Sequence, residues 1–144
     1  EPNEEQIELG KKMTEWGVAI VFGSHPHVIQ KSEIIQSNGE DKFIIYSLGN
    51  FLSNQRRESI NNKYTEDGVM VNIEVEKDFS NNKTIIKNVE YIPTWVNKYI
   101  ESGKPKYEIL PVEDFIDTEV FNQETLLKMK ESYKNTMNIM GQQQ

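Results

Sequence analysis

Apolar residues fall in short runs along most of this chain and recur at helical spacing near its two ends. The first run, Val18–Phe22, holds five apolar residues and stops at Gly23, which is typical of a strand buried on both faces. Before it, Asn3 and Gln6 form a capping-box pattern that begins a predicted helix, and Gly17 supplies its stop. We expect the core face of this helix to carry Leu9, Met13 and Trp16.

Two hairpins are predicted in the middle of the chain. Ser32–Gln36 and Phe43–Tyr46 flank a segment rich in turn residues and should pair as the first hairpin. Val69–Glu76 alternates apolar and polar residues at period two, and Thr84–Ile92 follows a second turn, so these two segments form the second hairpin. We expect Pro93 to end its second strand.

The last third of the chain predicts one more strand, Tyr107–Pro111, and then a helix. Gly141 and the three glutamines that follow it are predicted to be a frayed tail. Core packing is the expected role of the apolar stripe on the helix, and a contact surface for a partner or a second copy is the alternative. The stripe recurs every three or four residues, at Leu126, Met129, Tyr133, Met137 and Met140.

The only two histidines of the chain, His25 and His27, directly follow the first predicted strand. Loops at the carboxyl ends of buried strands commonly hold ligands and metals. Pro26 should keep His25 extended, and residues two apart in extended backbone point the same way, so both imidazoles would face one site. Imidazole is a common metal ligand, but a surface role is the ordinary one for a histidine. Spacing alone leaves both readings open, and two histidines do not complete a site.

Two further segments carry candidate chemistry. Ser47, Gly49 and Asn50 follow the second strand of the first hairpin, where they form either a simple turn or the edge of a site. Arg56 and Arg57 lie in a polar segment that we expect to be a loop, and they are the most concentrated positive charge near the histidines. An exposed arginine pair is more often solvated surface.

Composition narrows the class of protein. A chain of 144 residues with 36% hydrophobic content is one domain's worth of a globular protein or less. Its net charge of −7 argues against nucleic acid binding through a broad surface, and zero cysteines exclude disulfides and thiolate metal sites. The longest apolar run is too short to span a bilayer. Because the chain opens without methionine, we expect a piece of a longer protein, with any signal or anchor upstream.

Three motifs together resemble one family. Gly23–Gln30 reads Gly-Ser-His-Pro-His-Val-Ile-Gln, Tyr46–Phe51 reads Tyr-Ser-Leu-Gly-Asn-Phe, and Ile92–Val96 reads Ile-Pro-Thr-Trp-Val. They resemble the carboxyl-terminal part of the CapA family of poly-γ-glutamate capsule biosynthesis proteins, in the calcineurin-like metallophosphoesterase superfamily. The resemblance spans about residues 6–110.

The resemblance implies an α+β fold that forms part of a layered α/β/α metallophosphoesterase sheet, with antiparallel hairpins and a C-terminal helix. Residues 1–112 would be the C-terminal part of the metallophosphoesterase-like domain, and residues 113–144 would be a helical extension.

The same resemblance implies a two-metal centre that binds divalent manganese, zinc or iron. His25 and His27 would be metal ligands and, with Asn50, the catalytic residues. The superfamily's acidic ligands come from upstream motifs, and Phe51 stands where a ligand would be expected, so this chain would hold one wall of a site. By the same resemblance, Ser47 and Gly49 would lie at its substrate-binding edge. Arg56 and Arg57 are added to the substrate-binding residues for their positive charge, and not by the resemblance.

By resemblance, the whole protein would act in the synthesis, export or anchoring of poly-γ-glutamate on the outer side of the cell membrane. It would work with a capsule synthetase and membrane subunits, and would reach the membrane only through an upstream segment. Association with further copies of itself, as a homo-oligomer, is an open alternative. One hypothesis is a metal-dependent hydrolase or transferase. The other is a non-catalytic binding or assembly subunit that retains only the fold.

Overall fold

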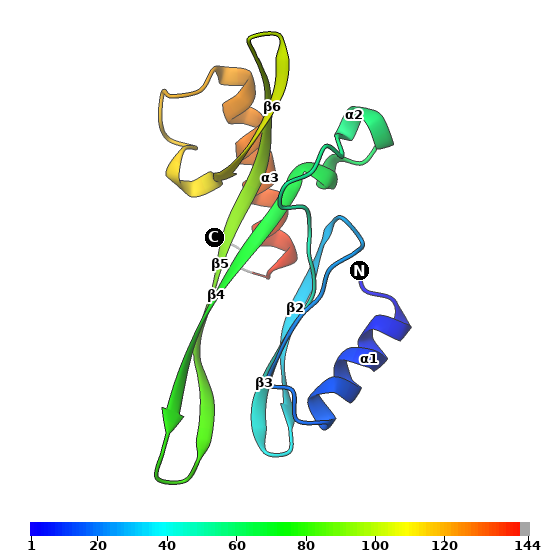
Figure 1. Ribbon diagram of the computed structural model, residues 1–144, viewed down its shortest axis with the longest axis vertical. Helices are drawn as coiled ribbons and strands as arrows, with labels where there is room; N and C mark the ends of the chain where they lie inside the picture. Colours follow the sequence, from blue (N-terminus) through cyan, green and yellow to red (C-terminus); the bar gives the residue numbers. More distant parts are fainter. Residues whose placement is uncertain (142–144) are drawn as a thin grey trace.

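The structure is a computed structural model that describes residues 1–141, and it contains two three-stranded sheets with helices packed beside them (Figure 1). The first sheet has the order β1-β3-β2 and the second β4-β5-β6. The predicted α+β class is confirmed. Of the predicted tail, residues 142–144 lie outside the described part. The elements are α1 (Glu4–Glu15), β1 (Ile20–Phe22), β2 (Ile29–Ser37), β3 (Glu40–Leu48), α2 (Arg57–Ile60), η1 (Lys63–Glu66), β4 (Asp67–Asp78), β5 (Lys83–Glu101), β6 (Lys104–Pro111), η2 (Val112–Asp114) and α3 (Gln123–Ile139).

The start and end of α1 are as predicted. The Asn3 side chain accepts a hydrogen bond from the Gln6 N–H, and the Gln6 side chain accepts one from the Asn3 N–H, which completes a capping box. Past the last helical residue, Gly17 adopts a φ of 99°, the left-handed conformation in which glycine ends helices at least cost.

The predicted core face of α1 is wrong. Leu9 is 54% exposed and Trp16 is 74% exposed. The helix instead turns Gly10 toward β3, where a Cβ on that glycine would lie 3.3 Å from side-chain atoms of both Ile44 and Tyr46. A residue without a side chain lets the helix axis approach the sheet closely, so the large apolar residues on the neighbouring face are left outside.

The strand at the first apolar run is shorter and less buried than predicted. β1 pairs only with β3, in parallel, and forms the edge of its sheet, so Phe22 remains 51% exposed. The strand that is buried along its length is β3, the central strand, where residues from Lys42 to Ser47 are all buried. A neighbour on each side explains this burial, whereas β1 has one neighbour.

Both predicted hairpins are confirmed. β2 and β3 meet at a two-residue turn, Asn38-Gly39, with φ of 55° and 75°, as the favoured hairpin turns require. β4 and β5 pair along their length, but β5 does not stop at Pro93. Pro93 lies one residue before β6 begins to pair with β5, so at this position the strand has one neighbour and a missing N–H is tolerated.

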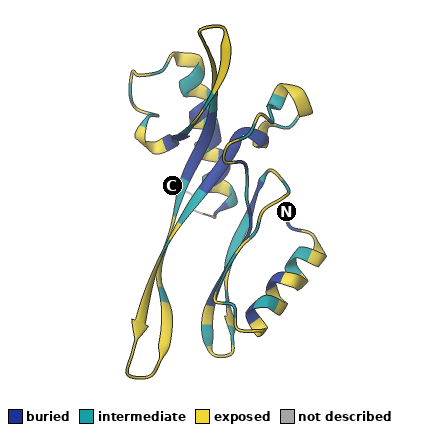
Figure 2. Ribbon diagram, in the orientation of Figure 1, coloured by how far each residue is buried: buried dark blue, intermediate teal, exposed yellow. Residues whose placement is uncertain are grey.

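The helix α3 packs against both sheets. Met129 joins a cluster with Trp95, Leu110 and Val112, and Met140 joins a second cluster with residues from both sheets. Figure 2 shows that buried residues gather where the strands meet α3, while the hairpin ends are exposed. Core packing is confirmed for these two methionines. The division at residue 112 stays a prediction. The second cluster comprises Ile29, Phe43, Ile45, Val69 and Met140.

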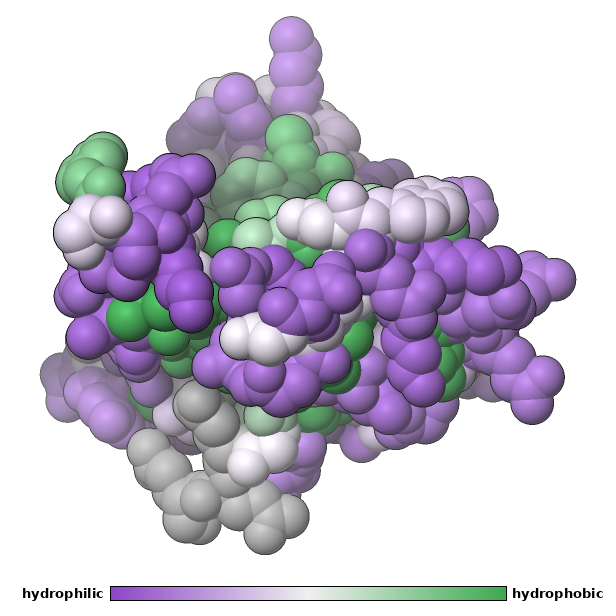
Figure 3. Space-filling model, turned by 90° about the horizontal axis from the view of Figure 1, so that it is seen from below, coloured by the Kyte–Doolittle hydropathy of each residue, from purple (hydrophilic) through white to green (hydrophobic). Residues whose placement is uncertain are grey.

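The outer surface is mostly hydrophilic when seen from the hairpin ends, with separate apolar patches (Figure 3). None of the helices in residues 1–141 is both long and apolar enough to cross a membrane.

The position of the core predicts the cost of removing side chains from the first sheet. Ile45 is 0% exposed and Ile34 is 55% exposed, on adjacent strands. We expect Ile45→Ala to lower the free energy of unfolding by about 2–5 kcal/mol, since it leaves a cavity between the sheets. The matched variant Ile34→Ala should cost less than about 1 kcal/mol. Urea unfolding followed by circular dichroism measures both, and equal costs would contradict this placement of the core.

Candidate functional site

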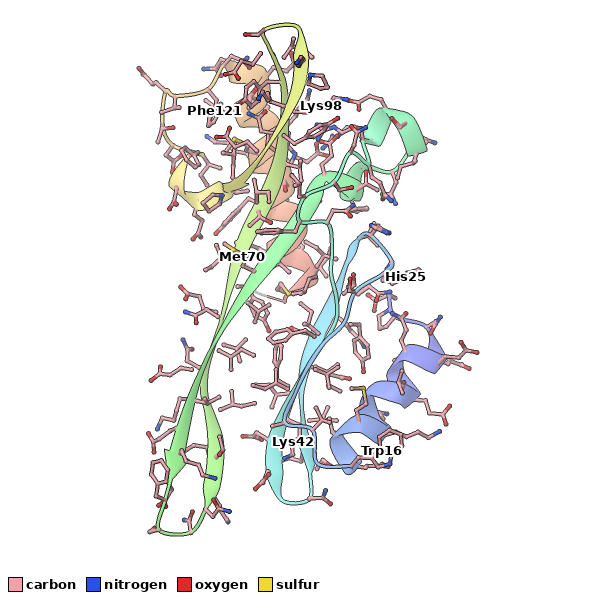
Figure 4. All side chains as sticks on the ribbon, viewed as in Figure 1. Trp16, His25, Lys42, Met70, Lys98 and Phe121 are labelled. Carbon is pink, nitrogen blue, oxygen red and sulfur yellow. The ribbon has the colours of Figure 1, made fainter. Side chains whose placement is uncertain are left out.

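The loop that carries the histidines is a strained chain reversal. His25 has a φ of 100° and His27 a φ of 58°, so the predicted extended conformation is wrong. The reason is topological: β1 runs parallel to β3 and β2 runs antiparallel to it, so the residues between β1 and β2 must reverse the chain. Non-glycine residues at positive φ are costly and concentrate at functional sites. Figure 4 labels His25 on this loop.

The two imidazoles do not converge as the extended geometry predicted. Their ring centroids lie 6.4 Å apart, with 49° between the ring planes. Two imidazoles bound to one tetrahedral zinc ion would have centroids about 5 Å apart, given a metal–nitrogen distance of about 2 Å. In this arrangement, therefore, the rings suit two neighbouring metal ions, or one ion after a movement of the loop.

Asn50 is the residue that the structure brings to His27. His27 Nδ1 lies 2.7 Å from Asn50 Oδ1. The Asn50 amide nitrogen donates to the His27 carbonyl oxygen at 2.9 Å and to the Thr65 carbonyl oxygen, also at 2.9 Å. Asn50 is buried whereas His27 is exposed, so a fixed amide supports an accessible ring.

A close backbone crossing places Asn50 at this point. Gly49 forms an isolated bridge with Gly68, and the Asn50 N–H donates to the Asp67 carbonyl oxygen at 3.2 Å. A Cβ at Gly68 would lie 2.2 Å from the Asn50 carbonyl oxygen, and Gly49 has a φ of 75°. Glycine is therefore required at both positions. This segment is therefore more than a simple turn, because it connects the two sheets. Its place at the edge of a site stays a prediction.

Ser47 and Gly49 lie at the base of this arrangement. Ser47 is buried, and its hydroxyl oxygen accepts a hydrogen bond from the Gly49 N–H at 3.2 Å. This contact supports the turn before Asn50. A substrate-binding role for either residue stays a prediction.

Arg56 and Arg57 are held by a buried carboxylate. Arg56 Nε lies 3.1 Å from one Glu66 oxygen, and Arg57 Nε lies 3.4 Å from the other. Trp95 Nε1 donates to the same carboxylate at 3.3 Å, and Glu66 itself is 1% exposed. The segment expected to be a polar loop contains α2 and η1, and the arginine side chains are only 12% and 22% exposed. Their substrate-binding role stays a prediction, but two acids already offset their charge, since Arg57 Nη1 also donates to a Glu131 oxygen at 2.9 Å.

Asp67 is a buried acid that sequence reasoning missed. Burial raises the pKa of its carboxyl group to about 6, against the lowering effects of the Ser132 hydroxyl and of Asn135, which donates to Oδ2 at 3.0 Å. Arg57 lowers the pKa and Glu66 raises it. Its other oxygen, Oδ1, has no hydrogen-bond partner among the described residues. The only sequence signal was a pair of acids directly before an alternating strand, which is ordinary for a solvated turn.

The metal-ligating potential of the chain rests on the two imidazoles. Within residues 1–141, no group of three or more histidine, cysteine or acidic side chains is arranged to hold a metal ion. The donor set nevertheless fits a part of a site, since imidazole nitrogen suits zinc and iron, whereas manganese favours the oxygen ligands that would complete such a site. The His27 ring also has a hydrogen-bonding partner on one nitrogen, as metal-bound histidines usually do.

The segment that carries this geometry matches a known family. Residues 1–55 match the family described as bacterial capsule synthesis protein PGA_cap, and they include both histidines, Ser47, Gly49 and Asn50. This match supports the resemblance to the CapA family that the motifs predicted, over 55 of the 144 residues of the chain. The match ends before Arg56, so it does not include the arginine pair or the Ile92–Val96 motif.

Two curated relatives carry the same family name. The chain is 42% identical over 55 residues to the PGA biosynthesis protein CapA of Bacillus subtilis (strain 168) and 39% identical over 54 residues to the capsule biosynthesis protein CapA of Bacillus anthracis. Each alignment covers 38% of this chain, but only 13% and 12% of the respective relatives. No solved structure matches the chain.

The raised pKa of Asp67 predicts a pH-dependent stability. The native carboxyl group ionises near pH 6, whereas the usual value is 3.8, so the native state binds the proton more tightly than the unfolded state. The free energy of unfolding should therefore fall as pH rises through this window, by up to about 3 kcal/mol in total. Asp67→Asn removes this loss, so the stability of the variant relative to the wild type should increase from pH 4 to pH 7.

Urea unfolding at several pH values measures this difference, and Asp114→Asn, at an exposed position, controls for the loss of one negative charge. A difference between Asp67→Asn and the wild type that does not change with pH would contradict the assignment.

The spacing of the rings predicts weak metal binding by the 144-residue chain. We expect Zn²⁺ and Mn²⁺ to bind with dissociation constants above the micromolar range, because two imidazoles 6.4 Å apart do not chelate one ion without a loop movement. Replacing either histidine by glutamine should weaken binding only severalfold. Isothermal titration calorimetry measures the affinities. Submicromolar binding that His25→Ala abolishes would show that the chain contains a complete site.

Proposed function

We propose that this chain forms one wall of a divalent-metal site in a protein of poly-γ-glutamate capsule biosynthesis. The observation that carries the proposal is the His27–Asn50 pair, which lies inside the family-matching segment and joins an exposed imidazole to a buried, fixed amide. A strained loop held by such a contact is expected where geometry serves function rather than stability alone.

In this proposal His25 and His27 hold the metal, and acidic ligands that this chain does not supply complete its coordination. A bound manganese, zinc or iron ion would lower the pKa of a water molecule and polarise a phosphate or amide oxygen. Asn50 orients the His27 ring through Oδ1 and holds the loop backbone through its amide nitrogen. Ser47 and Gly49 form the turn that delivers Asn50.

Poly-γ-glutamate, the proposed substrate, is a polyanion, and this chain carries a net charge of −7. The average field therefore repels the polymer, and a local positive centre is needed to bind it. Glu66 and Glu131 offset the charge on Arg56 and Arg57, so the metal at the histidine loop is the stronger candidate for that centre. The proposed partners are a capsule synthetase and membrane subunits, and the proposed location is the outer side of the cell membrane.

The second candidate function is a non-catalytic binding or assembly subunit. The contacts of Asn50 favour it, because this residue binds the His27 and Thr65 carbonyl oxygens through its side chain and the Asp67 carbonyl oxygen through its N–H, and so ties the histidine loop to the start of β4. In that case the histidine loop would have a structural role, and Asn50 would serve to join the two sheets.

The test is polymer production by a capsule-forming strain whose protein carries His27→Ala, in the form in which the organism makes it. We expect polymer to fall by about tenfold or more, because the variant removes a proposed ligand and the contact to Asn50. Ser24→Ala, an exposed position in the same loop, is the matched control and should leave production unchanged. Protein abundance is measured in both strains. Normal capsule from the His27→Ala strain at normal abundance would reject the catalytic proposal and favour the assembly role.

A further inference from the structure

We propose that Asn50 is a positioning residue that holds neutral His27 as the Nδ1–H tautomer. In that tautomer Nε2 is the only ring nitrogen with a free lone pair, so it alone can bind a metal ion or accept a proton. The inference follows from counting donors and acceptors at one amide. Asn50 Nδ2 has two N–H groups, and two backbone carbonyl oxygens lie 2.9 Å from it, those of His27 and Thr65.

The orientation of the amide is set by chemistry. If the amide were flipped, its oxygen would face both carbonyl oxygens, and none of these three atoms could donate a hydrogen. With the nitrogen on the carbonyl side, Oδ1 faces His27 Nδ1 at 2.7 Å and can only accept. The hydrogen of this contact must therefore come from the ring, so Nδ1 carries the proton.

The Asn50 side-chain amide binds His27 at two points. Asn50 Nδ2 binds the His27 carbonyl oxygen and Oδ1 binds the His27 ring, so backbone and side chain are fixed relative to each other. This offsets the cost of the positive φ at His27, which is 58°. Asn50 is fixed in turn by Thr65 and by its N–H bond to the Asp67 carbonyl. Both ring orientation and tautomer are thus determined before any ligand arrives.

His25 differs in each respect. Its ring has no hydrogen-bond partner among residues 1–141, and it is exposed. The two histidines are therefore inequivalent: His27 is preorganised, and His25 is free to rotate. Where the proposed metal site exists, on which this consequence rests, His27 is the ligand that defines the position of the ion and His25 adapts to it. Groups that hydrogen-bond to the second ring nitrogen of a metal-binding histidine commonly govern metal affinity.

The experiment is long-range ¹H–¹⁵N correlation NMR of the ¹⁵N-histidine-labelled 144-residue chain at a pH where both rings are neutral. The two ring systems are assigned with His25→Gln and with His27→Gln. We expect His27 to show the Nδ1–H pattern alone and His25 to show the averaged pattern of a free ring. A nuclear Overhauser effect from His27 Hδ1 to the Asn50 side chain should accompany it. An Nε2–H pattern for His27, or a pattern like that of His25, overturns the proposal.

Asn50→Leu tests whether the amide is the cause, because leucine has a similar volume and no acceptor. The Nδ1–H pattern of His27 should be lost, and its persistence in the folded variant would overturn the role of Asn50. If this variant does not fold, the Overhauser effect in the wild type decides, and its absence rejects the contact. Adding Zn²⁺ to the wild type should shift Nε2 of His27 and leave Nδ1 protonated. The tautomer is read without any capsule assay, so failure of the proposed function would leave this result standing.

Discussion

The contact on which the rest of the structure depends is the close approach of two backbone segments at Gly49 and Gly68. It brings the end of β3 against the start of β4 and so joins the two sheets at one corner. The approach is possible only because neither residue has a side chain to occupy the space. Asn50 then lies between the sheets, with its backbone bonded to Asp67 and its side chain bonded to the histidine loop. The residues that join the two sheets are therefore the same residues that support the histidine loop.

Next to this corner, the start of β4 is held by buried polar groups rather than by apolar packing. Glu66 ends η1 and Asp67 begins β4, and each is 1% exposed. Glu66 is satisfied by two arginines and by Trp95, while Asp67 receives a hydrogen bond from Asn135 of α3. Removing one partner of such a buried pair is expensive, because the remaining charge stays in the interior. This network explains how the segment between Asn50 and β4 forms α2 and η1 although its composition is that of a loop.

Local patterns predicted much of the fold, and contacts between distant segments account for the errors. The capping box at Asn3, the Asn38-Gly39 turn and the alternation in β4 are local signals, and each formed the expected element. Leu9 and Trp16 were misplaced because the position of Gly10 against β3, rather than periodicity, decides which face of α1 is buried. The histidine loop was placed correctly after β1, but its conformation depends on strand directions that the sequence does not state. Asp67 was missed because its burial comes from α3, far along the chain.

The position of the Asn50 N–H has a consequence for the dynamics of the molecule. This hydrogen is bonded to the Asp67 carbonyl, in the place where the two sheets meet, and Asn50 is 4% exposed. Solvent can reach it only when the sheets separate or the corner opens locally. The rate at which this one amide exchanges with deuterium is therefore a direct measure of how often the supporting wall of the histidine loop comes apart.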